Sequence, residues 1–208
     1  MLGLGNWRRN DLSDKPSGVL GLLFGAQKDY VKALGPIFAL SLFLFTFSTF
    51  VGYSMGDEIP ASVFEGVLSN IPDPSEATDL ELFSAILTNN VIACFIFLAS
   101  GVLVGIPPLL FLALNGFFVG WVSYSAASEL GLGFVLMTLL PHGVIEIPAI
   151  TLSVAMGVGL GYQIINKLRR REGLQRYVVD SLNVFITRIV PMLIVAAIIE
   201  TGLIIFFG

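Results

Sequence analysis

The stretch FVLMTLLPHGVIEIPAITLSVAMGVGLGYQII, residues 134–165, contains no lysine or arginine over 32 positions. One straight helix of that length would measure about 48 Å, at about 1.5 Å per residue, whereas the core of a bilayer is roughly 30 Å thick. Two full crossings would accommodate the length, but they would place the basic residues 167–176 opposite the basic N-terminal region. We therefore expect a short half-helix that ends near Pro141, followed by one crossing from about Gly143.

The composition of the chain is that of a membrane protein. Hydrophobic residues make up 55% of the 208 positions, charged residues make up 12%, and the mean hydropathy is +0.87. A soluble domain usually has about 25% charged residues, so lipid is the expected solvent for most of this chain. The single cysteine, Cys94, lies in an apolar stretch, cannot form an intrachain disulfide and is expected to be buried.

Charge is segregated along the sequence. All eleven lysines and arginines fall within residues 8–32 or 167–188, whereas residues 57–81 carry seven acidic residues and no base. Because cytoplasmic loops of membrane proteins accumulate lysine and arginine, this asymmetry predicts a cytoplasmic N-terminus and an extracytoplasmic acidic loop at 57–82. With five crossings the C-terminus is then extracytoplasmic, and the expected location is the plasma membrane.

The remaining apolar runs predict an all-α, polytopic transmembrane bundle with about five spans plus the half-helix. Besides the crossing from Gly143, the expected spans are Gly35–Tyr53, about 84–106, Leu109–Ala127 and Ile189–Phe207. Pro107 and Pro108 are expected at the apex of the hairpin between the second and third spans, because proline disrupts a helix interior.

The chain is expected to form two parts. Residues 1–34 are a cytoplasmic N-terminal segment, and residues 35–208 are a transmembrane domain with a basic cytoplasmic segment at 166–188. Residues 17–34 and 174–190 mix apolar and charged residues at helical spacing. Each is either a helix lying in the headgroup plane or a cytosolic extension of the neighbouring span.

Three G-x-x-x-G motifs lie in three successive predicted spans. Small residues four positions apart let helix backbones approach closely in lipid, where apolar side chains provide no special driving force for association. The motifs favour a compact bundle, and we expect a homo-oligomer, with a dimer favoured. The glycines are Gly101, Gly105, Gly116, Gly120, Gly157 and Gly161.

Polar residues inside the predicted spans are the candidate functional residues, because an ionisable group in a bilayer core is costly unless it is paired or hydrated. His142 and Glu146 share one helical face, between the predicted break at Pro141 and Gly143 and the second proline, Pro148. Pro148 also leaves the carbonyl of residue 144 without its helix hydrogen bond. Other candidates for this polar core are Asn89, Asn90 and Asn115, with Glu200 ranked below them.

Two interpretations of these polar residues remain open. They are either a buried hydrogen-bonded network that fixes how the helices meet, or a binding site at a broken helix such as transporters use. A large polar cavity would favour the second interpretation and a dry, packed bundle the first.

Enzyme chemistry finds little support. The sequence lacks H-E-x-x-H, a phosphate-binding loop and a dinucleotide fingerprint, and no nucleic-acid partner is expected. A metal site is not predicted, because His142 and Glu146 would need further ligands. A Ser100–His142 dyad lacks the G-x-S-G context of rhomboid-type proteases. We expect no cofactor and favour a non-enzymatic role.

One family combines these motifs in the same order. LTNNVIACFIFLASGVLVGIPPLLFLALNGFFVGWV, followed by LPHGVIEIPAITLSVAMGVGLG, resembles the stage II sporulation protein M family over about residues 86–165. Its members share an Asn-Asn pair at the start of a span, an N-G-x-x-x-G segment and the signature P-H-G-x-x-E-x-P-A.

The resemblance implies a multipass membrane architecture and a set of motif residues. The family's namesake supports engulfment in spore-forming bacteria by assembling with cell-wall hydrolases and their activators. We expect a scaffold or accessory subunit with envelope-protein partners in the lipid bilayer, and do not extend engulfment to this chain. A transporter or channel-like protein is the alternative. The motif residues are Asn89, Asn90, Asn115, Gly116, Gly120, His142, Gly143, Glu146 and Pro148.

Overall fold

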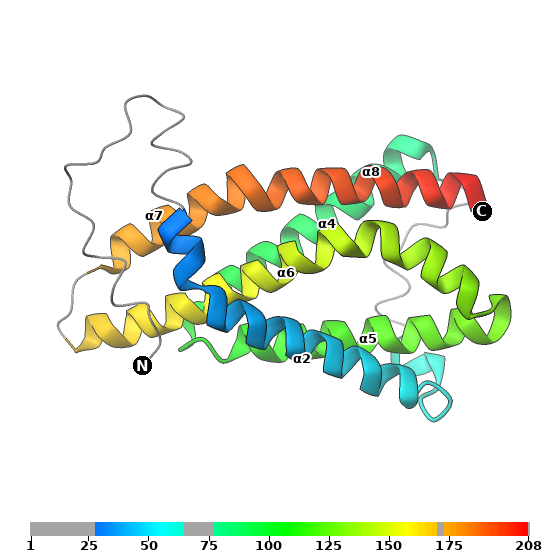
Figure 1. Cartoon of the computed structure of the whole chain (residues 1–208), viewed down its shortest axis with the longest axis horizontal. Helices are drawn as coiled ribbons and strands as arrows, with labels where there is room; N and C mark the ends of the chain where they lie inside the picture. The colour runs from blue at the N-terminus through cyan, green and yellow to red at the C-terminus, as the bar shows by residue number, and fades with distance from the viewer. Residues whose placement is uncertain (1–27, 65–76, 170–172, 208) are drawn as a thin grey trace.

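The computed structural model describes residues 28–64, 77–169 and 173–207, with the side chains of Ala61, His142 and Phe207 excepted. The described residues form an all-α bundle without strands, which confirms the predicted fold class (Figure 1). Five helical stretches are long and apolar enough to cross a membrane. The α-helices are α2 (Gly35–Ser54), α4 (Asp79–Ala99), α5 (Pro107–Leu130), α6 (Leu132–Leu168), α7 (Leu174–Val184) and α8 (Val190–Phe207).

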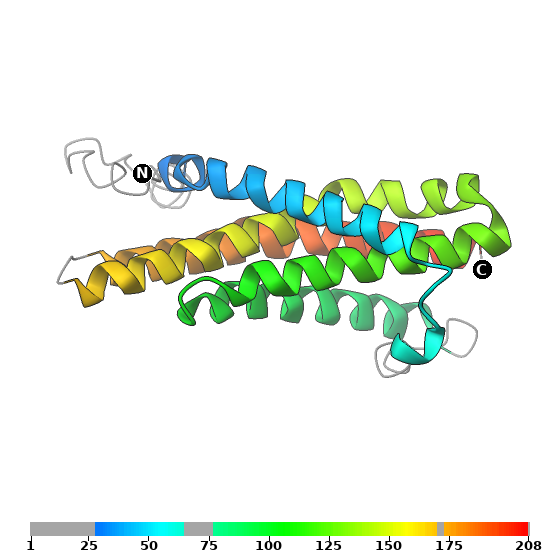
Figure 2. The ribbon, with the colours of Figure 1, turned by 90° about the horizontal axis from the view of Figure 1, so that it is seen from below.

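The central helix of the bundle is α6. In its crossing segment, Gly143–Leu168, 67% of the most apolar window is buried, against 22 to 28% in the other four spans. It contacts α2, α4, α5 and α8, while α2 and α5 pack closely against each other. Figure 2 shows the helices running side by side along the long axis. The other spans therefore assemble around α6 and turn their outer faces away from it.

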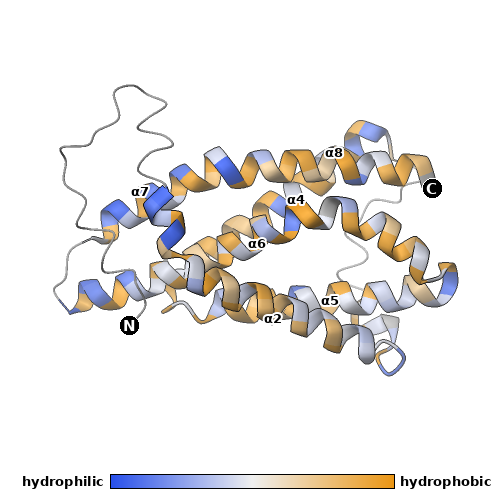
Figure 3. Cartoon of the chain, viewed as in Figure 1, coloured by the Kyte–Doolittle hydropathy of each residue, from blue (hydrophilic) through white to orange (hydrophobic). Residues whose placement is uncertain are grey.

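Those outer faces are apolar. On α2, Phe43, Phe47 and Phe50 are all exposed. The ribbon of every long helix is orange, and hence hydrophobic, over much of its length in Figure 3. Burying this much apolar area requires a hydrocarbon environment, since a soluble monomer rarely exposes extensive contiguous apolar patches. The chain is therefore a membrane protein.

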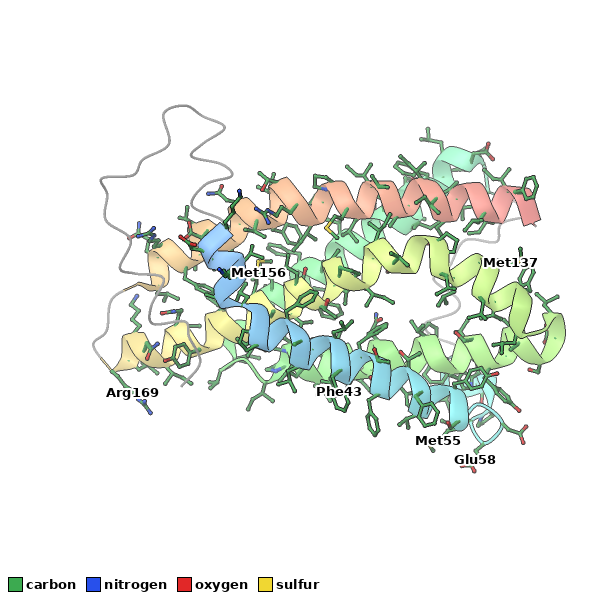
Figure 4. All side chains as sticks on the ribbon, in the orientation of Figure 1. Phe43, Met55, Glu58, Met137, Met156 and Arg169 are labelled. Atoms are coloured by element: carbon green, nitrogen blue, oxygen red, sulfur yellow. The ribbon has the colours of Figure 1, made fainter. Side chains whose placement is uncertain are left out.

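Most of the described charged residues lie toward the two ends of the bundle, with Glu146 and Glu200 as exceptions within the spans. Arg169 and Glu58 lie at opposite ends in Figure 4. We call the first the basic end; its described bases are Lys28, Lys32, Lys167, Arg169 and Arg176. We call the other the acidic end; its described acids are Asp57, Glu58, Asp79, Glu81 and Glu129.

Local sequence determines where several helices begin. Proline occupies one of the first two positions of α2 and of α5, where no intrahelical donor is needed. At α4 a capping box forms, in which Thr78 Oγ1 accepts from the Glu81 amide at 3.3 Å and a Glu81 carboxylate oxygen accepts from the Thr78 amide at 2.9 Å.

The hairpin between α4 and α5 differs from the prediction. Pro107 and Pro108 do not form its apex, because they begin α5. The chain turns at Val104 and Gly105, whose φ angles are +63° and +77°. Positive φ is unusual for a β-branched residue, whereas glycine adopts it without steric cost.

The predicted break in the long apolar stretch is also corrected. The helix α6 continues through both Pro141 and Pro148 over 37 residues, so a separate half-helix is not confirmed. It changes direction along its length in Figure 1, as expected where proline removes helix hydrogen bonds. The portion Leu132–Pro141 is too short to cross a membrane, whereas Gly143–Leu168 is long enough.

The amphipathic stretch at 174–190 extends the last span. It forms α7 and the π-helical segment η5 (Phe185–Ile189), which leads without interruption into α8. Tyr177 and Ser181 on α7 are buried within the protein. The corresponding N-terminal stretch, 17–34, lies outside the described residues up to position 27, and residues 28–33 are helical.

Glycines mediate the contact of α6 with the α4–α5 hairpin. A Cβ on Gly101 would overlap the carbonyl of Gly157, and a Cβ on Gly161 would overlap the backbone at Val104 and Gly105. Gly101 lies in the short 3-10 segment η4 (Ser100–Val102) and Gly105 in the turn, so this motif is not part of a continuous helix as the sequence suggested. The two backbones still meet without intervening side chains.

The same type of contact joins α2 and α5. A Cβ on Gly120 would overlap the carbonyl of Thr49, and one on Gly52 would overlap the carbonyl of Phe117. At Gly116 a Cβ would lie 2.7 Å from Ser48 Oγ. All six motif glycines therefore lie at contacts within one chain.

Replacing Gly120 by alanine is expected to lower the free energy of unfolding by about 1–3 kcal/mol, because the added methyl group must push α2 and α5 apart. Gly133→Ala is the matched control, since no atom lies within 4 Å of a Cβ at that position of α6. Thermal unfolding in detergent measures both. Equal melting temperatures for the two variants would contradict tight backbone contact at Gly120.

Candidate functional site

The polar residues nearest the middle of the bundle converge where α4, α6 and α8 meet. The carboxyl group of Glu146 on α6 interacts electrostatically with that of Glu200 on α8. It also interacts with the thiol of Cys94 on α4. We call Cys94, Glu146, Ser153 and Glu200 the core polar cluster.

Cys94 and Ser153 form the most buried part of this cluster. Both are fully buried, and the two side chains are in hydrogen-bonding contact. Ser153 Oγ also donates to the Ala149 carbonyl at 3.0 Å. Its hydroxyl is thereby satisfied inside the helix, which is the common solution for serine in an apolar environment.

Glu200, ranked below the other polar candidates from the sequence, lies on α8, which packs along α6. Its carboxyl group is near enough to that of Glu146 for the two to interact electrostatically. The signal was present in the sequence, since Glu146 and Glu200 are both acidic residues within apolar spans. The pairing of α6 with α8 was the missing information.

The asparagine candidates do not join the cluster by hydrogen bonds. Asn89 is exposed on α4 and Asn90 is half-buried beside it, while Asn115 is half-buried on α5. Among the residues whose side chains are described, no hydrogen bond links any of the three to Glu146. The side chain of His142 lies outside the described residues, so its predicted pairing with Glu146 stays a prediction.

A neighbouring threonine hydroxyl provides a hydrogen-bond donor to backbone carbonyls next to Pro148. Thr151 Oγ1 donates to the carbonyl of Ile147 at 2.8 Å and lies 3.2 Å from that of Pro148. Gly143 is buried, and a Cβ there would meet only Ile147 Cδ1 at 3.7 Å, which is ordinary contact. Gly143 is thus not required for close packing, in contrast to the six glycines of the G-x-x-x-G motifs.

Metal and serine-protease chemistry gain no support from the described residues. Within them no group of three or more histidine, cysteine or acidic side chains is close enough to hold a metal ion. Ser100 Oγ donates to the Phe97 carbonyl at 3.1 Å. That bond assigns the hydroxyl a local, structural partner.

A second polar arrangement lies toward the basic end. Tyr30 OH lies 2.6 Å from Ser181 Oγ, and Tyr177 OH donates to the Met156 carbonyl at 2.8 Å. The two tyrosine rings meet edge to face at 5.2 Å. Burial raises the pKa of Tyr30 far above its ordinary value, so this hydroxyl stays neutral. We call Tyr30, Tyr177 and Ser181 the tyrosine network.

The tyrosine network fastens three segments together. Tyr30 comes from the helical residues 28–33, Tyr177 and Ser181 from α7, and the acceptor Met156 from α6. A Cβ on Gly159 would overlap the Tyr177 hydroxyl, so this glycine provides the space for it.

Comparison with known proteins identifies the family. The family model for stage II sporulation protein M matches residues 41–203. The chain belongs to the stage II sporulation protein M family. The match includes every described residue of the core polar cluster and most of α2 through α8.

Two similar proteins come from Methanocaldococcus jannaschii. The uncharacterized protein MJ0706 is 32% identical over 143 residues, covering 66% of this chain and 62% of the relative. The uncharacterized protein MJ0793 is 31% identical over 123 residues, covering 57% of this chain and 68% of the relative. The chain thus spans about three fifths of the first relative's length. No solved structure matches this chain.

Cys94 provides a direct probe of the core polar cluster, because it is the chain's one cysteine and is fully buried. We expect a maleimide reagent to label the folded protein very slowly in detergent and completely after thermal unfolding, since a buried thiol is inert. Gly157→Leu should accelerate labelling by forcing α6 away from the Phe97 carbonyl on α4. Gly133→Leu is the control, and fast labelling of the unaltered protein would refute the burial.

Proposed function

We propose that this stage II sporulation protein M family member is a non-enzymatic scaffold or accessory subunit of an envelope complex. We place it in the plasma membrane with the basic end in the cytoplasm. The observation that supports a scaffold is the internal use of all six motif glycines, which makes the bundle a closely packed unit. Such a unit can hold polar segments at both membrane surfaces in a fixed relation.

The acidic end supplies one such segment. Trp121 Nε1 donates to the Ile59 carbonyl at 3.0 Å, and the Phe64 ring packs on Trp121 with centroids 4.6 Å apart. These contacts fasten the start of the acidic loop to α5. Envelope proteins with basic surfaces are the partners that this end suits electrostatically.

Homo-oligomerisation is part of the proposal, with a dimer favoured. Because the motif glycines are engaged within the chain, the surface joining two copies would have to lie elsewhere, on the outward faces of the bundle. The relatives named above add no partner, since both are described as uncharacterized.

A transporter or channel-like function is the second candidate. The interaction of Glu146 with Glu200 favours it, because carboxyl groups from two helices at one level of a membrane protein often mark a path for ions or protons. In a scaffold the same carboxyl groups would carry neither ions nor protons.

The two functions predict different results for Glu146→Gln and His142→Ala. If the protein is a scaffold, both substitutions should lower its melting temperature. Liposomes containing either the unaltered protein or a variant should then show no ion or solute uptake. As a transporter, the folded protein should support uptake that the variants abolish. Thr88→Ala, at an exposed position of α4 outside the candidate residues, is the control. Uptake that depends on Glu146 in a fully folded variant would overturn the scaffold proposal.

The proposed orientation can be tested with cysteines at the two ends. In a Cys94→Ala background, Arg169→Cys should react with an impermeant maleimide only from the cytoplasmic side, because basic segments remain inside. Glu58→Cys should react only from the outside. Labelling of Arg169→Cys in intact cells would show that the orientation is the opposite of the one proposed. Labelling of both cysteine variants from the same side would contradict the five crossings.

A further inference from the structure

The basic end carries more than a scattered set of charges. Lys28 and Lys32 flank Tyr30 on its helix, and Arg176 precedes Tyr177 on α7. The bonds of Tyr30 to Ser181 and of Tyr177 to the Met156 carbonyl hold these segments against α6. The tyrosine network therefore gathers cationic side chains from separate parts of the sequence around one end of α6.

The last turns of α6 add two further bases. Lys167 and Arg169 are exposed, and Arg169 closes the helix. Acidic residues are fewer here: among the described residues of these segments, Asp29 and Asp180 are the only carboxylates, and Asp180 lies 3.7 Å from Arg176 Nε. The local charge is thus positive and suited to an anion.

One buried polar side chain, a turn before Lys167, has no hydrogen-bond partner among the described residues. Gln163 on α6 is 1% exposed, and within the described part of the chain neither its amide nitrogen nor its amide oxygen makes a hydrogen bond. Leaving a buried amide unsatisfied costs about 1–3 kcal/mol, so such groups usually have a reason to be retained. Gln163 lies one turn beyond Gly159, the residue that the Tyr177 hydroxyl contacts, and one turn before Lys167.

We propose that Gln163, together with the bases Lys28, Lys32 and Lys167 at the same end of the bundle, forms a binding site for the headgroup of an anionic phospholipid. The bases attract the phosphate. The amide of Gln163 offers a donor and an acceptor together, which matches a headgroup that carries both phosphate oxygens and hydroxyl groups, such as phosphatidylglycerol. This inference goes beyond the scaffold proposal and does not depend on it.

The depth of the site fits a lipid. Gln163 precedes Arg169 by six residues, or about 9 Å along α6, which places the amide below the outermost bases and toward the apolar part of the bundle. A lipid held by its acyl chains in the membrane can present its headgroup at that depth. A freely soluble anion would have to leave water to reach it.

The test uses the full-length protein in detergent, with phosphatidylglycerol or phosphatidylcholine added in increasing amounts. We expect phosphatidylglycerol to raise the melting temperature more than phosphatidylcholine does, with an effect that weakens as salt is added. The double variant Lys32→Gln/Lys167→Gln should weaken the apparent affinity for phosphatidylglycerol roughly tenfold. Both lysines are exposed, so this variant should fold normally.

Gln163→Met separates binding from packing. Replacing an unsatisfied amide by an apolar group of similar size should leave the melting temperature without phosphatidylglycerol unchanged or higher, yet reduce the response to this lipid. A purely structural glutamine would instead lower stability in every lipid. Ser41→Ala is the matched control. Within the described part of the chain, Ser41 Oγ is also buried without a hydrogen-bond partner, but it lies on α2, a helix that contains no lysine or arginine.

Three outcomes would overturn the proposal. The first is an equal response to phosphatidylcholine and phosphatidylglycerol. The second is an unchanged response in Gln163→Met together with a reduced one in the lysine variant, which would indicate diffuse surface attraction without a headgroup site. The third is equal stabilisation by soluble glycerol phosphate, which would indicate a free anion as the ligand.

Discussion

Backbone contact at glycine is the constraint on which this bundle depends. Gly157 and Gly161 bring α6 against the end of α4 and the turn that follows, and Gly116 and Gly120 bring α5 against α2. In lipid an apolar side chain gains nothing by leaving its surroundings, so close approach of backbones has to supply much of the attraction between helices. With α6 held in this way, the polar groups that it carries acquire a fixed depth in the bundle.

The polar chemistry of α6 then falls at two depths. Near the middle, Glu146 and Ser153 face Glu200 and Cys94. Nearer the basic end, the Met156 carbonyl accepts a hydrogen bond from the Tyr177 hydroxyl, and Gln163 has no partner among the described residues. One helix thus carries both a central group of polar residues and a buried amide near the basic end.

Sequence patterns predicted the fold class and most span boundaries, because apolar length and charge segregation act locally along the chain. Gly35–Tyr53 was expected and α2 is Gly35–Ser54. These patterns gave wrong predictions where the local structure depends on contacts with other helices. Pro141 and Pro148 were expected to break a helix that other spans support on several sides, and Pro107 was expected at an apex that Val104 and Gly105 form. The approach of Glu200 to Glu146 depends on which helices pair, which no periodicity reveals.

The π-helical segment η5 gives the last span a property of its own. A π turn contains one residue more than the α turn it replaces, so it acts as a single-residue insertion that rotates everything before it by roughly 100° relative to α8. That rotation helps to set which side of α7 meets α6. Loss of one residue between 185 and 189 would leave an unbroken α-helix that still spans the membrane but presents a different face of α7. The number of residues between α7 and α8, rather than their hydrophobicity, therefore determines whether the Tyr177 hydroxyl reaches the Met156 carbonyl.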